Sequence, residues 1–294
     1  MTYIGSNMNR FLETNIINSD KFASASDLIY SQRIGNKLFK NSPNKKIINI
    51  SNDENFSCTV YKLINFELSE NDVIFCNTDY LDNLFFHLNK INELKNLKLV
   101  TNQTDQLITK KVFDRKPKCI ANWYSVNIGY EDRQLEPIPL GLASEFSKKN
   151  LTSDFFENKI NVFDYKKEKI NLYINFASNT NFQERGGLYK KFKDKKWVTV
   201  KRPDTELVNY QKDLIKNSFV LCPLGNGVDT HRIWETLYSG SIPVTKKHIN
   251  FSFAKDLPIL FVDSYDEINF TLLNDYMNNL KIEDLNARMY REAF

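Results

Sequence analysis

The residues best suited to chemistry lie in one stretch, residues 218–244 (SFVLCPLGNGVDTHRIWETLYSGSIPV). An apolar run typical of a buried strand leads into a loop with Gly225 and Gly227, and the loop leads into a helical pattern. The first turn of such a helix has unpaired N–H groups and a positive dipole end, and glycine lets a ligand approach the backbone closely. The stretch therefore predicts an anion-binding site.

Two charged side chains extend this prediction from an anion to a nucleotide. Arg232 falls in the first turn, where its fork of donors suits a diphosphate, and Glu235 lies on the same face three residues later. A carboxylate at that position can accept hydrogen bonds from both hydroxyls of a ribose. The candidate nucleotide-binding residues of this stretch are Gly225, Asn226, Gly227, Asp229, Thr230, His231, Arg232 and Glu235.

The same residues also have a purely structural interpretation. Asp229 or Thr230 can cap the helix, and Glu235 can do no more than pair with Arg232. The loop is not a P-loop, because no GK[ST] follows it, and it is not a G-x-G-x-x-G dinucleotide fingerprint. Spacing alone leaves both interpretations open.

Alternating strand and helix patterns must position this stretch. Expected strands cover 46–51, 72–76, 97–101, 119–123, 137–142, 170–176, 197–200, 218–222, 241–244 and 259–262. Expected helices cover 23–39, 80–94, 185–192, 205–216, 230–238, 265–280 and 282–294, with Gly240 as the C-terminal cap of the fifth. Such alternation predicts an α/β fold with parallel sheets and helices on their faces.

The chain divides into two halves in this pattern. We expect an N-terminal Rossmann-like domain over residues 1–150 and a C-terminal one over 169–280, joined by a charged linker. A last helix over 281–294 is expected to return to the first domain. Ligands of open α/β sheets bind at the carboxyl ends of the strands, which is where the loop after residue 222 falls.

Composition limits the class of protein. The 294 residues are 41% hydrophobic with a net charge of +4, and the lysines are scattered rather than interleaved with aromatic residues in a stripe. We therefore expect a globular protein with no nucleic-acid partner. The four cysteines are far apart without a C-x-x-C pair, which argues against a disulfide framework or a zinc site and favours a reducing compartment.

Targeting signals are not recognisable in the sequence. The first residues, MTYIGSNMNRFLETN, have no apolar region of a secretory signal, and no run of 18 uncharged apolar residues occurs, so no transmembrane segment is expected. We expect a cytoplasmic protein, with peripheral attachment to a membrane left open.

The stretch 218–244 resembles the C-terminal signature of the exostosin-like glycosyltransferases, whose bacterial and viral members are the nearest in pattern. The shared features are Cys222-Pro223, the G-x-G loop 225–227, Arg232, Glu235 and G-x-I-P-V at 240–244. Two further segments are similar, INFASNTNFQERGGLYKKF and NWYSVNIGYEDRQLEPIPLGLA. The match is strong over about 30 residues and looser over about 170, and it departs at 175–177, where many relatives have F-x-G with a basic residue.

This resemblance implies a GT-B fold, in which two Rossmann-like domains face each other across a cleft. It also implies transfer of a hexose or pentose, with inversion, from a nucleotide-sugar such as a UDP- or GDP-sugar to a glycan or other hydroxyl acceptor. No other cofactor is implied. Carried over by position, Glu235 would hold the ribose, and Arg232 and Arg185 would hold the diphosphate.

A metal ion is not expected. Glycosyltransferases of the GT-A type usually hold a divalent cation with an Asp-x-Asp motif, and no two aspartates here are separated by one residue. Asp229 and His231 make only two ligands, with no third nearby. Arg185, Arg232 and the loop backbone would then supply the positive charge that stabilises the departing nucleoside diphosphate.

Inverting transfer also needs a general base for the acceptor hydroxyl, from the end of a strand in the first half. Asp105 and Asp79 both follow apolar runs, and we favour Asp105, although each can instead be a helix cap. Asn102, Asn122 and Trp123 are expected at comparable strand ends, where they would touch the acceptor. Trp123 is alternatively a core residue.

Two other function classes remain open. One is a nucleotide-sugar-binding α/β enzyme of the isomerase or epimerase type, and the other is a catalytically inactive carbohydrate-binding relative. Two separate α/β halves argue against the first of these, and the presence of Arg232 and Glu235 argues against the second.

Overall fold

A computed structural model describes residues 16–30, 33–35, 51–53, 58–60, 68–91, 93–156, 169–203 and 205–280. The chain separates into two compact units, Met1–Lys148 and Lys149–Phe294. None of the helices in the described ranges combines the length and the apolar character needed to span a bilayer. The helix predicted over 281–294 lies outside the described residues.

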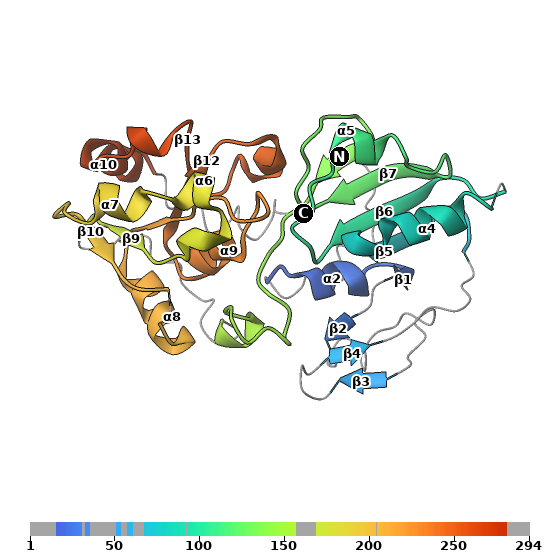
Figure 1. The fold of residues 1–294 in the computed structure, drawn as a ribbon, viewed down its shortest axis with the longest axis horizontal. Coiled ribbons are helices and arrows are strands. Elements are labelled where there is room, and N and C mark those ends of the chain that lie inside the picture. The colour runs from blue at the N-terminus through green and yellow to red at the C-terminus, as the bar shows by residue number, and fades with distance from the viewer. Residues whose placement is uncertain are drawn as a thin grey trace. The chain divides into compact units, whose positions relative to one another are not determined.

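The first unit contains a five-stranded sheet in which every pair of neighbours is parallel (Figure 1). Its strands, in spatial order, are β1 (Leu28–Tyr30), β5 (Val73–Asn77), β6 (Leu97–Asn102), β7 (Ile120–Ser125) and β8 (Leu135–Pro137). Its helices are α2 (Ser19–Ser24), the 3-10 turn η2 (Thr78–Tyr80), α4 (Leu81–Leu88) and α5 (Lys110–Phe113). The apolar spacing in α4 buries Leu81, Leu84, Phe85 and Leu88, so the helix covers the sheet with one face.

Near the N-terminus the prediction is wrong. The helix expected over 23–39 is interrupted, because residues 28–30 form β1 and pair with β5 in the main sheet. These three side chains are at most 8% exposed, so burial of a short apolar run outweighs the helical spacing. A small antiparallel sheet, β2 (Arg33–Gly35), β4 (Cys58–Val60) and β3 (Ser51–Asp53), follows. Residues 46–50 of the first expected strand lie outside the described residues.

Residues 137–142 are also not the strand that was expected. Only Pro137 belongs to β8, and the chain then turns through Gly141, whose φ is +74°. A Cβ on Gly141 would lie 2.3 Å from the carbonyl oxygen of Ile17, so only glycine fits this approach. The next residue, Leu142, donates a 2.7 Å hydrogen bond to the same carbonyl.

The second unit contains another all-parallel five-stranded sheet. Its strands are β9 (Leu172–Ile174), β10 (Val198–Val200), β11 (Phe219–Leu221), β12 (Ile242–Lys246) and β13 (Leu260–Val262). The spatial order β10-β9-β11-β12-β13 corresponds to 2-1-3-4-5 within the unit, which is a common doubly wound order. The central strands β9 and β11 are continuous buried apolar runs, as strands covered on both faces must be.

Helices surround this second sheet (Figure 1). They are α6 (Phe182–Arg185), α7 (Leu188–Phe192), α8 (Leu207–Lys216), α9 (His231–Tyr238) and α10 (Phe270–Asn279). Helix α9 packs against β12 and α8, and Gly240, with φ +67°, follows its end as predicted. The helix expected over 265–280 is divided into the 3-10 turn η6 (Tyr265–Glu267) and α10, because Asn269 caps a new helix.

Two parallel sheets in two units confirm the predicted α/β class with two Rossmann-like halves.

Candidate functional site

The strand order of the second sheet identifies where a ligand should bind. The chain leaves β9 for β10 on one side, whereas β11 lies on the other side of β9, so the carboxyl ends of β9 and β11 form a topological switch point. Helices that follow neighbouring strands diverge at such a point and leave a crevice for a ligand. The loop 175–181 follows β9, and the loop 222–230 follows β11.

Arg185 joins these two loops. Its Nε donates to the carbonyl of Leu224 at 2.9 Å, its Nη2 to that of Pro223 at 3.2 Å, and its Nη1 to that of Ala177 at 3.1 Å. From the start of the same helix, the amide nitrogen of Asn181 donates to the next carbonyl, Gly225, at 2.8 Å. Three consecutive carbonyls of the loop 222–230 are therefore held from α6.

Arg185 thus has a structural role that its sequence position did not reveal. Arg185 is 7% exposed, and among the residues that the structure describes no carboxylate pairs with its guanidinium. Burial, together with the nearby Arg232 guanidinium, lowers its pKa from the ordinary value. The guanidinium also lies 5.6 Å from the ring centre of Phe176, so it brings positive charge to the segment 175–177.

Gly225 packs tightly against Arg185 and Thr230. A Cβ at this position would lie 3.1 Å from Nη2 of Arg185 and 3.3 Å from Cγ2 of Thr230. Its N–H donates to the carbonyl of Gly227 at 3.0 Å, which closes the tip of the loop. Asn226, between the two glycines, is exposed, and His231 is the half-buried first residue of α9.

The expected helix cap is wrong for both candidates. Thr230 occupies the N-cap position but accepts no hydrogen bond there, and its buried Oγ1 has no partner within the described part of the chain. Asp229 is 1% exposed, and both of its carboxylate oxygens accept from the indole N–H of Trp234, at 3.0 and 3.1 Å. Since the N-cap Thr230 makes no capping hydrogen bond and Asp229 accepts from Trp234, the described residues show no N-cap side chain on α9, and its first turn keeps the character of an anion site.

Arg232 and Glu235 share a face of α9, as predicted, but they are joined through a third residue. The hydroxyl of Tyr210, on α8, accepts from Nη1 of Arg232 at 2.9 Å and donates to Oε2 of Glu235 at 2.9 Å. The guanidinium of Arg232 also lies 5.2 Å from the centre of the Tyr210 ring. The structural alternative of a direct Arg232–Glu235 pair is therefore replaced by a bridge.

The second oxygen of Glu235 holds the segment that follows the first unit. Oε1 accepts from the backbone N–H of Leu151 at 3.0 Å, and Leu151 is fully buried. Glu235 itself is 2% exposed. Each carboxylate oxygen can accept a second hydrogen bond, so the group keeps capacity for a ribose hydroxyl beside its two protein donors.

The electrostatics of the bridge follow from burial and charge. Burial raises the pKa of Tyr210 well above its usual value; Arg232 opposes this shift and Glu235 adds to it, so the hydroxyl stays protonated and can donate. Burial works against the charge of Arg232, but its neighbours Tyr210 and Glu235 more than compensate, and its pKa is raised. Arg232 is therefore a fixed cation in the first turn of α9, and the carboxylate of Glu235 lies one turn further along the same helix.

Sequence reasoning missed Tyr210 and Leu151 as members of this site. Tyr210 fits the apolar spacing of the helix expected over 205–216, and it is 6% exposed. Its role depends on how α8 crosses α9, which spacing along one helix does not contain.

The candidate acceptor residues lie in the first unit. Asp79 is exposed in η2, directly after β5, and Asp105 is exposed three residues after the end of β6. Neither is a helix cap, because Asn77 caps η2 and Thr109 caps α5. Both carboxylates are therefore at the carboxyl side of their strands and open to solvent.

The other acceptor candidates differ in position. Asn102 ends β6 as expected; it is fully buried, its Oδ1 accepts from the N–H of Gln103, and its Nδ2 has no partner among the described residues. Asn122 and Trp123 are not at a strand end, because β7 continues to Ser125. Asn122 pairs in register with Lys98, near the start of β6.

Trp123 is a core residue, the alternative left open above. It is fully buried, and its indole N–H donates to Thr101 at 2.8 Å. The ring packs edge-on to Phe85 at 5.6 Å and stacks with Phe113 at 6.1 Å. Neither face is left open to a sugar.

Cysteines and metal-binding side chains give no further site in the described residues. Cys76, Cys119 and Cys222 are buried free thiols, and burial raises the pKa of Cys222 to about 12, which makes it unreactive. Within the same ranges, no three His, Cys, Asp or Glu side chains gather closely enough to hold a metal ion.

Comparison with known proteins places this geometry in context. The sequence model of a family described as the RXYLT1 C-terminal domain matches residues 172–283, which include α6, α8, α9 and the loop 222–230. No curated protein sequence matches the chain.

Two solved structures show a low level of similarity to the chain. An α1,3-fucosyltransferase crystal structure is 16% identical over 90% of this chain and 82% of its own, with a TM-score of 0.40. The pneumococcal O-GlcNAc transferase GtfA, in complex with UDP and GlcNAc, is 10% identical over 77% of this chain, with a TM-score of 0.36. This chain covers 54% of the GtfA chain. Residues 172–283 are thus similar to the RXYLT1 C-terminal domain family, and this similarity lies in the second unit of the chain.

Proposed function

We propose that the chain is an inverting, metal-independent glycosyltransferase that moves a sugar from a nucleotide-sugar to a glycan or other hydroxyl acceptor. The observation that carries the proposal is the Arg232–Tyr210–Glu235 cluster beside an uncapped helix N-terminus, at the switch point of a doubly wound sheet. The match of residues 172–283 to a glycosyltransferase family supports it.

The diphosphate of the donor would bind at the first turn of α9. The N–H groups of the first turn and the helix dipole favour an anion there, and the N-cap residue Thr230 makes no side-chain capping hydrogen bond. Arg232 supplies a fixed positive charge, and Arg185 a second one under the loop. In the transfer step, negative charge develops on the departing diphosphate, and preorganised cations stabilise that charge without reorganising.

The ribose would bind at Glu235. Its two oxygens already accept from Leu151 and Tyr210, so they are fixed in orientation, and each can take one more hydrogen bond. Inverting transfer then needs a base in the first unit, and the exposed carboxylates Asp105 and Asp79 are the candidates.

Calorimetric titration of UDP and GDP tests the donor site directly. We expect saturable binding of one of them, reduced at least about tenfold in Arg232→Ala because a charged contact to the diphosphate is lost. Lys247→Ala is the matched control, since Lys247 is an exposed cation of the same unit, 2.8 Å from Asp263. A folded protein that binds no nucleoside diphosphate would overturn the proposal.

A panel of nucleotide-sugars then tests the chemistry. Transfer or slow donor hydrolysis should persist in EDTA, because side chains replace the metal. Complete loss in EDTA with recovery in manganese would refute metal independence. Nucleotide binding without any transfer or hydrolysis would favour the inactive carbohydrate-binding alternative.

A further inference from the structure

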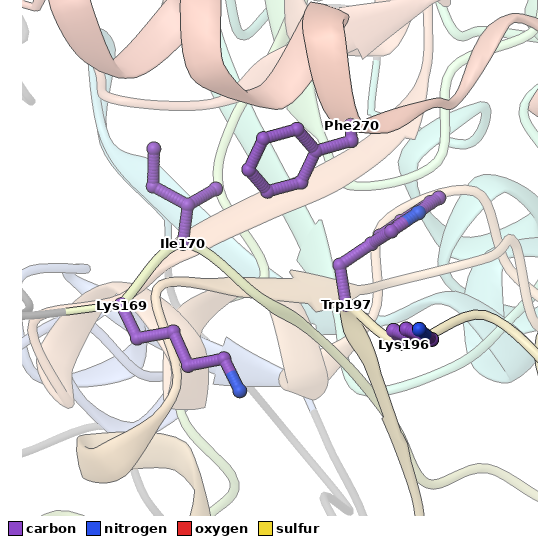
Figure 2. Close-up of a pocket in the computed structure, with 5 residues that line it drawn as sticks. All are labelled: Lys169, Ile170, Lys196, Trp197 and Phe270. Carbon is purple, nitrogen blue, oxygen red and sulfur yellow. The ribbon is translucent and has the colours of Figure 1, made fainter.

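A second concave surface lies at the other end of the second sheet. It is a pocket of about 510 Å³, and the residues that line it are Lys169, Ile170, Lys196, Trp197 and Phe270 (Figure 2). The first two precede β9, the next two precede β10, and Phe270 begins α10. Because the strands are parallel, the amino ends of β9 and β10 lie at the edge opposite the loop 222–230. The pocket is therefore separate from the proposed donor site.

One side of the pocket is aromatic. Figure 2 shows the ring of Phe270 between Ile170 and Trp197, with the two lysine chains on the other side. Phe270 is 46% exposed, and the half-buried Trp197 is fixed by an edge-on contact with Phe192 at 6.1 Å. In the part of the chain that the structure describes, nothing accepts a hydrogen bond from the indole N–H of Trp197. The wall therefore offers flat apolar faces and one donor.

The other side of the pocket is positively charged. Lys169 and Lys196 are exposed, neither has an ion-pair partner among the described residues, and no acidic residue lines the pocket. The N-terminus of α10, at Phe270, adds the positive end of a ten-residue helix dipole. These three features favour an anion over a neutral ligand.

The geometry points to a binding site for an anionic sugar, a pyranose ring that carries a carboxylate or a phosphate. The C–H face of the ring would lie against Trp197 and Phe270, a hydroxyl would accept from the indole N–H, and Lys169 and Lys196 would hold the anion. A volume of 510 Å³ suits one or two sugar rings, within the usual range of about 300–1,000 Å³ for ligand pockets.

Simpler ligands would leave part of this surface unused. Inorganic phosphate would not need the aromatic wall, and a neutral sugar would not need the lysines. A lipid surface would need aromatic side chains that project, whereas Trp197 is half-buried and packs against Phe192. The site goes beyond the proposed sugar transfer, because it requires neither a nucleotide nor the acceptor base.

Tryptophan fluorescence can test the site selectively. The chain has three tryptophans, and Trp123 and Trp234 are 0% and 2% exposed, so a ligand in the pocket should quench mainly Trp197. The probes are glucuronic acid, glucose 6-phosphate, glucose and inorganic phosphate. The test variant is the double substitution Lys169→Gln with Lys196→Gln, which keeps side-chain length and removes charge. The control is Lys193→Gln, an exposed lysine of the same segment that does not line the pocket.

We expect saturable quenching by at least one acidic sugar, with glucose at least about tenfold weaker. The double variant should lose this preference, whereas the control should keep it, and UDP or GDP affinity should change in neither. Equal quenching by glucose in wild type, or an unchanged acidic-sugar affinity in the double variant, would overturn the inference. Binding of inorganic phosphate as tight as that of the acidic sugars would also overturn it. The inference would also be overturned if the chain sedimented with anionic phospholipid vesicles but bound no acidic sugar.

Discussion

The hydroxyl of Tyr210 donates a 2.9 Å hydrogen bond to the buried carboxylate of Glu235, and the same hydroxyl accepts from Arg232. The bridge connects two helices, because Tyr210 lies on α8 and the other two residues lie on α9. It lets a cation and an anion remain close without direct contact, so each keeps hydrogen-bonding capacity for a ligand. A single oxygen atom therefore orients both groups of the proposed donor site.

Tyr210→Phe removes that oxygen and keeps the ring under the Arg232 guanidinium. We expect the free energy of unfolding to fall by about 1–3 kcal/mol, because a buried carboxylate and a guanidinium each lose a partner. Nucleoside diphosphate affinity should fall as well. Urea denaturation and calorimetry measure the two effects. Tyr276→Phe is the control, since the described structure gives the Tyr276 hydroxyl no hydrogen-bond partner and only a ring contact with Phe219. An equal loss of stability in both variants would mean that the bridge contributes nothing of its own.

Arg185→Lys tests whether the hydrogen bonds of Arg185 hold the loop 222–230 in place. A guanidinium reaches the carbonyls of Ala177, Pro223 and Leu224 together, and the compact ammonium of lysine cannot span all three. We expect faster amide hydrogen exchange in residues 222–230 and weaker nucleotide binding, with the charge unchanged. Lys191→Arg, a conservative exchange at a cation that pairs with Asp266, serves as the control. Exchange rates equal to those of wild type would show that the loop is held by other contacts.

The sequence was informative where the signal is local. The strand–loop–helix order of 218–244 follows from apolar runs and glycines that act within a few residues, and the i, i+3 spacing of Arg232 and Glu235 on α9 follows from helix geometry. The predictions that were wrong depend on tertiary contacts. Asp229 does not cap α9 because Trp234 takes both of its oxygens, and residues 28–30 are a strand because β5 offers them a partner.

Contacts between residues far apart in the sequence could not be predicted either. Tyr210 enters the site from a helix more than 20 positions earlier in the chain, and Leu151 comes from 84 positions away. The apolar run 119–123 predicts a strand that ends at Trp123. In the structure β7 pairs with β6 for two more residues, to Ser125, so Trp123 lies within the strand and its ring is in the core.

His248 should make stability depend on pH. It caps the 3-10 turn η5 (Ile249–Ala254), where its Nδ1 accepts from the N–H of Asn250, and burial lowers its pKa below the ordinary 6.5. The unfolded chain then binds more protons than the folded one just below pH 6.5, so this contribution is present above that pH and is lost as the pH falls. His248→Asn keeps a capping oxygen without the titration. Its unfolding free energy should fall less than that of wild type between pH 7.5 and 5.5, and a steeper fall in the variant would contradict the assignment.

Substitution of two aspartates, with a third as control, tests which carboxylate acts as the base for the acceptor hydroxyl. If Asp105 takes the proton of the acceptor hydroxyl, Asp105→Asn should lower turnover by about 10²–10⁴-fold and leave nucleotide affinity intact. Asp79→Asn is the alternative. Asp114→Asn removes another exposed carboxylate of the same unit, whose partner Lys110 lies four residues earlier, and should have no effect. If both Asp79 and Asp105 variants keep near-normal turnover, the base lies elsewhere.

Substitutions of Arg232 and Glu235 should have different effects on nucleotide affinity and turnover if Arg232 binds the diphosphate and Glu235 binds the ribose. Glu235→Gln keeps the shape of the side chain and can still accept from Leu151, but it weakens charged hydrogen bonds to a ribose, which should cost about 1.5–3 kcal/mol of nucleotide affinity. Arg232→Ala removes the cation near the departing diphosphate, so turnover should fall by about 10²–10³-fold, more than binding does. Both substitutions also remove or weaken a hydrogen bond to Tyr210. The Tyr210→Phe variant measures how much of the loss in stability and affinity comes from those hydrogen bonds alone.

A purely structural cluster predicts another pattern. Both substitutions would then lower the unfolding free energy by amounts similar to that of Tyr210→Phe, and the folded fraction would bind nucleoside diphosphates with wild-type affinity. Calorimetric titration, with folding verified by circular dichroism at the same temperature, separates the two patterns. The ribose assignment is falsified if Glu235→Gln and wild type bind equally well, because a buried carboxylate that contacts both ribose hydroxyls cannot lose its charge without weakening that contact.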